Sequence, residues 1–142
     1  MSDLSAPSTT TPAASAIWLP TLVAAVAGTV VNALLFFIGQ AVGASFTAPD
    51  GAGNQVEITL ANVVVPSFVG MLVGAVAAVL ALPRWPGARR ALEVVGAVLA
   101  LVTGIFPWLV EMDTSTRVLL TLMHVALAVA YVAGIEAATR DT

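Results

Sequence analysis

Four long, uninterrupted apolar runs constrain the fold of this chain more than any other feature. They cover residues 17–40, 60–82, 92–110 and 118–138. Each is close to the roughly 20 residues that an α-helix needs to cross a hydrocarbon core about 30 Å thick. The apolar residues are continuous rather than alternating, which excludes the strands of a transmembrane barrel. We therefore predict an all-α membrane protein, a bundle of four transmembrane helices within residues 17–139.

The composition agrees with this prediction and excludes several classes of function. The chain is 59% hydrophobic and 9% charged, whereas about a quarter of the residues in a soluble domain are charged. It contains no cysteine, which excludes disulfides, thiol redox chemistry, iron–sulfur clusters and zinc–thiolate sites. Its five basic residues form no basic stripe, so a nucleic acid is not an expected partner. The expected partner is the lipid bilayer.

The first sixteen residues, "MSDLSAPSTTTPAASA", differ from the rest of the chain. Residues 1–16 are rich in Ser, Thr, Ala and Pro and cannot build a packed core, so we predict a disordered polar tail. The tail lacks the basic segment of a cleavable signal peptide, and the apolar run that follows is too long for one. The first helix is therefore expected to remain as an uncleaved anchor.

The distribution of arginines predicts the orientation of the bundle. The middle loop, "PRWPGARR", carries Arg84, Arg89 and Arg90, whereas the other two loops share only Arg117. Basic residues in short loops stay on the cytoplasmic side. We therefore expect the middle loop and both termini in the cytoplasm of a bacterium, with the chain as a multi-pass protein of its plasma membrane.

The two outer loops contain local structural signals. The segment "APDGAG" has strong turn chemistry, and the alternation in "QVEIT" suggests either a short strand or a segment that lies on the membrane surface. Asp113 or Ser115 is the expected N-cap of the last helix, because either side chain can accept from exposed backbone N–H groups. At the inner surface, Glu93 is expected to pair with Arg89 or Arg90.

Small and polar residues gather on one face of each helix, which predicts how the bundle is held together. Helices in lipid associate through close backbone approach and polar contacts. The faces consist of Gly28, Asn32, Gly39 and Gly43 in the first run; Gly70 and Gly74 in the second; Gly96, Ala100, Thr103 and Pro107 in the third; and Arg117, Thr121, His124, Ala128 and Tyr131 in the fourth.

A polar layer in the outer half of the bundle follows from helical rise. At about 1.5 Å per residue, one polar side chain from each helix lies about 9–12 Å below the outer surface. These side chains are Asn32, Ser67, Thr103 and His124. We expect His124 to point into the bundle, within reach of Asn32 or Thr103 directly or through one water, because lone polar groups in lipid are costly.

His124, the only histidine, has a structural and a functional interpretation. It can act as a neutral interhelical hydrogen-bonding group. It can equally bind a ligand or handle protons, as intramembrane ionisable residues often do. The candidate ligand-binding or polar-layer residues are His124, Asn32, Thr103, Ser67, Thr121 and Tyr131. No catalytic residue is assigned, and neither a metal site nor a cofactor is expected.

Four motifs together resemble a known family. They are "GTVVNALLFFIGQAVG", "NVVVPSFVGMLVGAVAAVLALPR", "VTGIFPWL" and "TLMHVALAVAYVAG". The chain is similar to an uncharacterised family of small four-helix integral membrane proteins from high-GC actinobacteria, a domain of unknown function. The resemblance implies no activity; it marks Asn32, Pro107 and His124 as positions of interest.

Three functions remain open from the sequence. The first, which we favour here, is a non-enzymatic structural or accessory bundle, as a homo-oligomer or with a membrane-protein partner. The second is a binder of, or enzyme acting on, an apolar quinone-like or polyketide-like ligand, using His124. The third is a small carrier or channel, although no carboxylate lies at mid-depth in the helices. A closed layer around His124 would favour the first function, a laterally open cavity the second, and a continuous water path the third.

Overall fold

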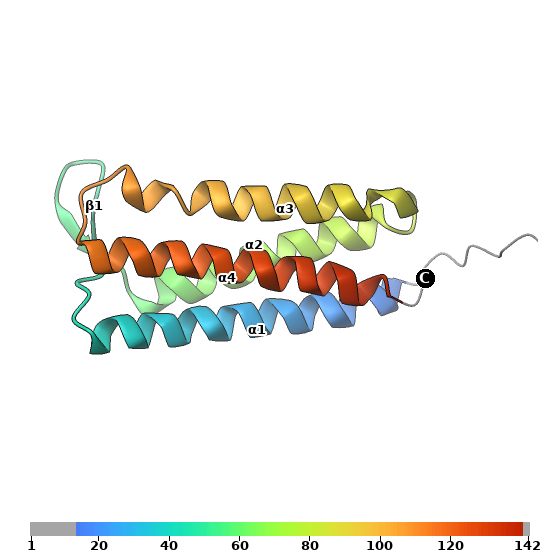
Figure 1. The fold of residues 1–142 in the computed structure, drawn as a ribbon, viewed down its shortest axis with the longest axis horizontal. Helices are drawn as coiled ribbons and strands as arrows, with labels where there is room; N and C mark the ends of the chain where they lie inside the picture. The colour runs from blue at the N-terminus through green and yellow to red at the C-terminus, as the bar shows by residue number, and fades with distance from the viewer. Residues whose placement is uncertain (1–13, 141–142) are drawn as a thin grey trace, which may run out of the picture.

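The computed structural model describes residues 14–140, which form four long helices and a short hairpin (Figure 1). In chain order the elements are α1 (Ala14–Ala41), β1 (Thr47–Pro49), β2 (Gln55–Glu57), α2 (Leu60–Ala81), the 3₁₀ turn η1 (Pro86–Ala88), α3 (Arg89–Thr103), the 3₁₀ turn η2 (Phe106–Trp108) and α4 (Thr114–Ala138). With α3 counted through η2, all four helices are long and apolar enough to cross a membrane, with mean hydropathies from 1.9 to 2.4. The prediction of four such helices is confirmed.

Several helix boundaries differ from those predicted. Helix α1 begins at Ala14, three residues before the predicted start, and residues 1–13 of the predicted tail lie outside the described residues. Helix α3 ends at Thr103 and gives way to η2, whereas the prediction ran to residue 110. Gly104 caps α3, and Pro107 has no N–H to continue the α-helical ladder. The apolar run therefore crosses this region partly as a 3₁₀ turn.

The helices run antiparallel and define two ends of the bundle (Figure 1). The hairpin end carries β1, β2 and the connection from α3 to α4. The arginine end carries the loop from α2 to α3 and the described ends of the chain. Helix α1 packs extensively on α4 and on α2, and α3 packs on α4, but α2 and α3 barely meet. This order leaves a gap between two helices that are consecutive in the chain.

Small residues allow α1 and α4 to approach closely. A Cβ atom at Gly134 of α4 would lie 2.7 Å from the Cβ of Ala24, and one at Gly28 of α1 would lie 3.1 Å from the Cβ of Ala130. Both helices thus place two small residues four positions apart against each other, as expected for helices that associate in lipid. The close approach predicted for Gly28 is confirmed.

Gly43 does not belong to that packing face. It lies beyond the end of α1 with φ of 83°, in a turn closed by a hydrogen bond from Ala44 N to Gly39 O of 2.9 Å. A left-handed backbone of this kind favours glycine. The prediction that Gly43 packs between helices is therefore wrong, and its role is to end α1.

The hairpin end is closed by an apolar cluster beneath the two strands. Phe46 is 2% exposed and stacks against Phe36 with 4.6 Å between ring centroids. The backbone N–H of Phe46 donates to Thr116 Oγ1 of α4 at 3.0 Å. Strands β1 and β2 pair antiparallel, with Ala48 opposite Val56, and this confirms the short strand predicted in "QVEIT".

At the arginine end, the predicted ion pair of Glu93 is confirmed. Glu93 is 5% exposed, and its Oε1 lies 2.7 Å from Arg89 Nε. Its second oxygen lies 3.7 Å from Arg90 Nη1. Arg89 also reaches Glu136 of α4 at 3.8 Å. The cluster therefore joins the beginning of α3 to the end of α4.

Asp113 joins the two loops of the hairpin end and caps α4. It accepts from the backbone N–H of Thr116 at 2.9 Å and from the hydroxyls of Ser45 and Thr116. The predicted N-cap is thus Asp113, whereas Ser115 lies within the helix. The hydrogen bonds from Ser45 and then Thr116 hold the pKa of Asp113 well below its usual range.

Replacing Asp113 by alanine is expected to lower the free energy of unfolding by about 1 kcal/mol through loss of the cap. Because the pKa of Asp113 is lower in the folded chain, its contribution is present above the ordinary carboxyl pKa of about 3.9 and is lost as the pH falls through the folded value. Thermal unfolding followed from pH 7 down to about pH 2 measures the onset of this loss. Glu111→Ala, in the same loop, is the control; an equal effect there would contradict the assignment.

Candidate functional site

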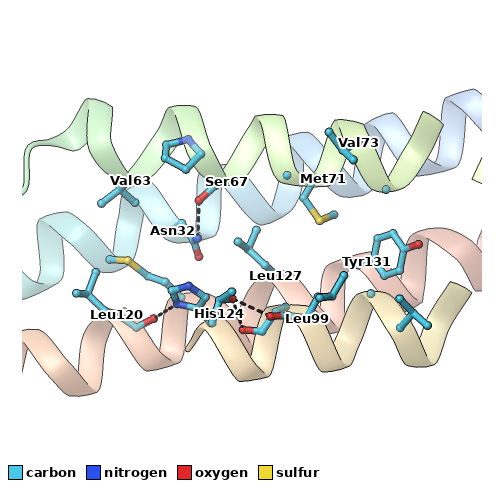
Figure 2. Close-up of a pocket in the computed structure, with 18 of the residues that line it drawn as sticks. Asn32, Val63, Ser67, Met71, Val73, Leu99, Leu120, His124, Leu127 and Tyr131 are labelled. Atoms are coloured by element: carbon cyan, nitrogen blue, oxygen red, sulfur yellow. Dashed lines mark hydrogen bonds between the residues drawn. The ribbon is translucent and has the colours of Figure 1, made fainter. Parts of the chain in front are cut away.

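An elongated cavity of about 580 Å³ lies between α2 and α3 (Figure 2). Its walls come from α2 and α3, its floor comes from α4, and α1 contributes only Asn32. From Asn62 to Ala77, the α2 wall is about 22 Å long by helical rise. Leucine, valine, methionine, alanine and glycine make up most of the lining. The cavity is therefore long, narrow and mainly apolar.

The cavity opens sideways, on the surface that the bundle turns towards lipid when it spans a membrane. Val73 of α2 and Val95 and Leu99 of α3 line it and are 65%, 56% and 61% exposed. At Gly70 of α2, a Cβ atom would have nothing within 4 Å. Of the Gly70–Gly74 pair predicted as a packing motif, Gly70 therefore lies in an open part of the wall, where the absence of a side chain widens the entrance, whereas Gly74 is closely packed.

Tyr131 of α4 sets the spacing of α2 and α3 at the arginine end of the cavity. One edge of its ring faces Gly74, where a Cβ atom would lie 2.5 Å from Cε2. The other edge faces Gly96, where a Cβ atom would lie 2.1 Å from Cε1. The ring therefore sits as a wedge between two glycines and holds the two walls apart.

A polar group lies farther along the cavity, towards the hairpin end. Asn32 is 1% exposed, and its Nδ2 donates to Ser67 Oγ of α2 at 2.9 Å. Its Oδ1 is buried and has no hydrogen-bond partner among the described residues. Figure 2 shows the Asn32 side chain reaching between α2 and α4, with its oxygen on the side where His124 lies.

His124 lines the same part of the cavity from α4 and is half-buried. Its Nδ1 lies 2.7 Å from the carbonyl oxygen of Leu120 (Figure 2). Because a carbonyl can only accept, Nδ1 carries the proton. No direct hydrogen bond joins His124 to Asn32 or Thr103: Nδ2 of Asn32 donates to Ser67, and the hydroxyl of Thr103 donates within its own helix. The expected contact through one water stays a prediction. The backbone of α3 approaches closely here, and a Cβ atom at Gly104 would lie 2.9 Å from His124 Cβ.

The two threonines among the predicted site residues are engaged elsewhere. Thr103 lines the cavity, but its hydroxyl donates to the carbonyls of Leu99 and Ala100 of its own helix. Thr121 does not line the cavity; its Oγ1 accepts from Trp108 Nε1 at 2.8 Å and lies 3.2 Å from Gly104 O. It therefore fastens η2 to α4.

The structure thus brings five of the six predicted residues to one cavity: Asn32, Ser67, Thr103, His124 and Tyr131. Sequence reasoning missed the apolar walls, including Met71 and Leu99, because any apolar residue of a spanning helix can face lipid equally well. In residues 14–140 no three His, Asp or Glu side chains gather where they could hold a metal ion. The arrangement suits recognition of an apolar molecule with one polar group.

Comparisons with known proteins place the chain in a family but assign it no activity. Neither the curated proteins nor the solved structures contain a match to it. A family model matches residues 12–141, which include all four helices, the hairpin and the cavity. The chain therefore belongs to the family described as a family of unknown function, DUF6069.

Proposed function

We propose that this protein binds a lipid-soluble small molecule in the cavity between α2 and α3. The observation that carries the proposal is the sideways opening of an apolar cavity of about 580 Å³ at whose floor Asn32 and His124 lie. Small-molecule sites commonly enclose about 300–1,000 Å³ and combine apolar walls with a few polar groups. A ligand dissolved in the bilayer can enter between the two helices without crossing water.

This proposal replaces the accessory bundle that the sequence alone favoured. A purely structural polar layer would be closed around His124, whereas here the layer borders an open cavity. Proton-coupled exchange would need a carboxylate at mid-depth, and Glu93 and Glu136 both lie near the arginine end. The hydroxyl of Thr103 donates within its own helix, and Ser67 Oγ accepts from the amide of Asn32. No base among the described residues activates either hydroxyl as a nucleophile, which suits binding better than catalysis.

The setting that we propose is the plasma membrane of a bacterium, with both termini and the arginine end on the cytoplasmic side. Three arginines at one end and acidic residues such as Asp50 and Asp113 at the other support this orientation. Reporter tags inserted at Gly51 and fused after Thr142 are expected to report opposite sides of the membrane. Tags that report the same side would contradict the proposed topology.

Binding can be tested with a photoreactive alkylbenzene, an apolar probe without a hydrogen-bonding group. In the purified protein in lipid nanodiscs, the probe is expected to label residues of the cavity walls, located by peptide mass spectrometry. Gly70→Leu should reduce this labelling several-fold, because the new side chain enters the open space beside Gly70. Leucine is also a better helix former than glycine, so α2 should remain stable.

The matched control is Val69→Leu, which changes the adjacent position of α2. Val69 is 50% exposed and does not line the cavity, so labelling should stay at the level of the unchanged protein. Equal labelling of lipid-facing and cavity residues would contradict a binding site. If the purified protein were in addition an oligomer in which neighbouring subunits cover α2 and α3, the accessory function would explain the open cavity better.

A further inference from the structure

We infer that the cavity selects a ligand whose polar group donates a hydrogen bond, such as an alcohol, phenol or quinol, over the ether, ketone or quinone of the same skeleton. The inference rests on the proposed binding function and specifies the ligand class. It follows from the hydrogen-bonding atoms that the cavity presents at the level of Asn32, Ser67 and His124.

The first such atom is Oδ1 of Asn32. In the structure, Nδ2 of Asn32 donates to Ser67 Oγ at 2.9 Å, and the residue is 1% exposed. Oδ1 is buried beside the cavity that Asn32 helps to line, and no described group donates to it. A buried carbonyl oxygen without a donor is costly. The ligand that relieves this cost must carry an O–H or N–H group.

The second atom is Nε2 of His124. Because Nδ1 donates to Leu120 O at 2.7 Å, the neutral ring leaves Nε2 with a lone pair and no proton. Nε2 has no hydrogen-bond partner among the described residues, and the ring lines the cavity. The bond to Leu120 thus fixes the tautomer, in the way that a partner on one ring nitrogen determines the role of the other. His124 therefore presents an acceptor to the ligand.

Thr103 and Ser67, the other polar side chains beside Asn32 and His124, also bear on which ligands the cavity prefers. The hydroxyl of Thr103 is committed to the carbonyls of Leu99 and Ala100. Ser67 Oγ accepts from Asn32, and no described group receives the proton of its hydroxyl. A ligand hydroxyl can accept this proton and donate to Asn32 or His124. An ether or ketone oxygen can only accept, and it leaves both acceptors of the protein unpaired.

The test is a competition between two probes that differ only in the donor. In nanodiscs, the photoreactive alkylbenzene labels the cavity walls, and 4-nonylphenol or its methyl ether, 4-nonylanisole, is added at equal mole fraction in the lipid. Nonylphenol is expected to displace the label about tenfold more effectively, which corresponds to one buried hydrogen bond. Asn32→Leu should remove most of this preference, and His124→Phe should reduce it.

Thr29→Val is the matched control on the same helix. Thr29 is buried, its hydroxyl donates to Ala25 O, and it does not line the cavity, so the preference for nonylphenol should persist. Thermal unfolding of each variant checks that the bundle is intact, and the preference of the unchanged protein tests the inference even if Asn32→Leu unfolds. Equal displacement by the two probes would overturn the inference while the labelling itself upholds the binding function. Failure of the alkylbenzene to label the walls would overturn both.

Discussion

Gly96→Ala is expected to destabilise the bundle by about 2 kcal/mol, although it adds only one methyl group. The new Cβ would lie 2.1 Å from Cε1 and 2.5 Å from Cδ1 of Tyr131, far inside van der Waals contact. The opposite edge of the ring faces Gly74, so the ring cannot retreat towards α2. Either α3 moves outward or Tyr131 leaves its place, and overpacking of this kind costs about 1–3 kcal/mol. The measurement is the free energy of unfolding in a denaturing detergent titration.

Gly70→Ala is the control for the wedge. It makes the same chemical change on α2, but its Cβ would have open space, so the free energy of unfolding should be unchanged or rise by up to about 1 kcal/mol from helix propensity. Combining Gly96→Ala with Tyr131→Leu should restore part of the loss, because the clashing ring is gone. Equal effects at Gly70 and Gly96 would rule out Tyr131 as the spacer between α2 and α3.

Gly134→Leu is expected to have the largest effect on stability, about 3 kcal/mol or more. The position lies in the contact between α1 and α4, where a Cβ atom would already lie 2.7 Å from Ala24 Cβ and 3.6 Å from the backbone of Thr21. A leucine there must push the two helices apart. The expected loss of unfolding free energy is at the high end of the range for overpacking, because helices in lipid approach closely only through small residues.

The matched control for this interface is Val129→Leu, on the same helix. Val129 is 64% exposed, so the larger side chain enters lipid and the free energy of unfolding should change by less than about 0.5 kcal/mol. Size-exclusion chromatography in mild detergent should show the Val129 variant unchanged and the Gly134 variant expanded or aggregated. A Gly134 variant as stable as the control would show that α1 and α4 do not pack through this face.

Local features of the chain were predictable because their causes are local. The four helices follow from the length and continuity of the apolar runs, and the N-cap at Asp113 and the pair of Glu93 with Arg89 follow from sequence spacing. The end of α3 was misjudged because Phe, Pro and Trp continue the apolar run, while Gly104 and Pro107 end the regular α-helix. Hydropathy does not distinguish an α-helix from a 3₁₀ turn.

The depth of the polar residues in the bundle was also partly predictable. Helical rise places Asn32, Ser67 and His124 at similar depth, and all three line the cavity. Their hydrogen bonds were not predictable, because rotation of each helix about its axis decides which atoms meet. His124 therefore bonds to Leu120 of its own helix, while Asn32 bonds to Ser67.

The sequence by itself determined that this chain forms four apolar helices and which faces carry small or polar residues, because both depend on composition and on the 3.6-residue period. Only the tertiary structure decided that α2 and α3, neighbours in the chain, stand apart. That separation depends on which helix each small face meets. Gly28 and Gly134 bring α1 and α4 together, whereas the ring of Tyr131 occupies the space beside Gly74 and Gly96. Glycine thus brings α1 and α4 together where a small residue lies opposite, but not α2 and α3, where the ring of Tyr131 lies opposite.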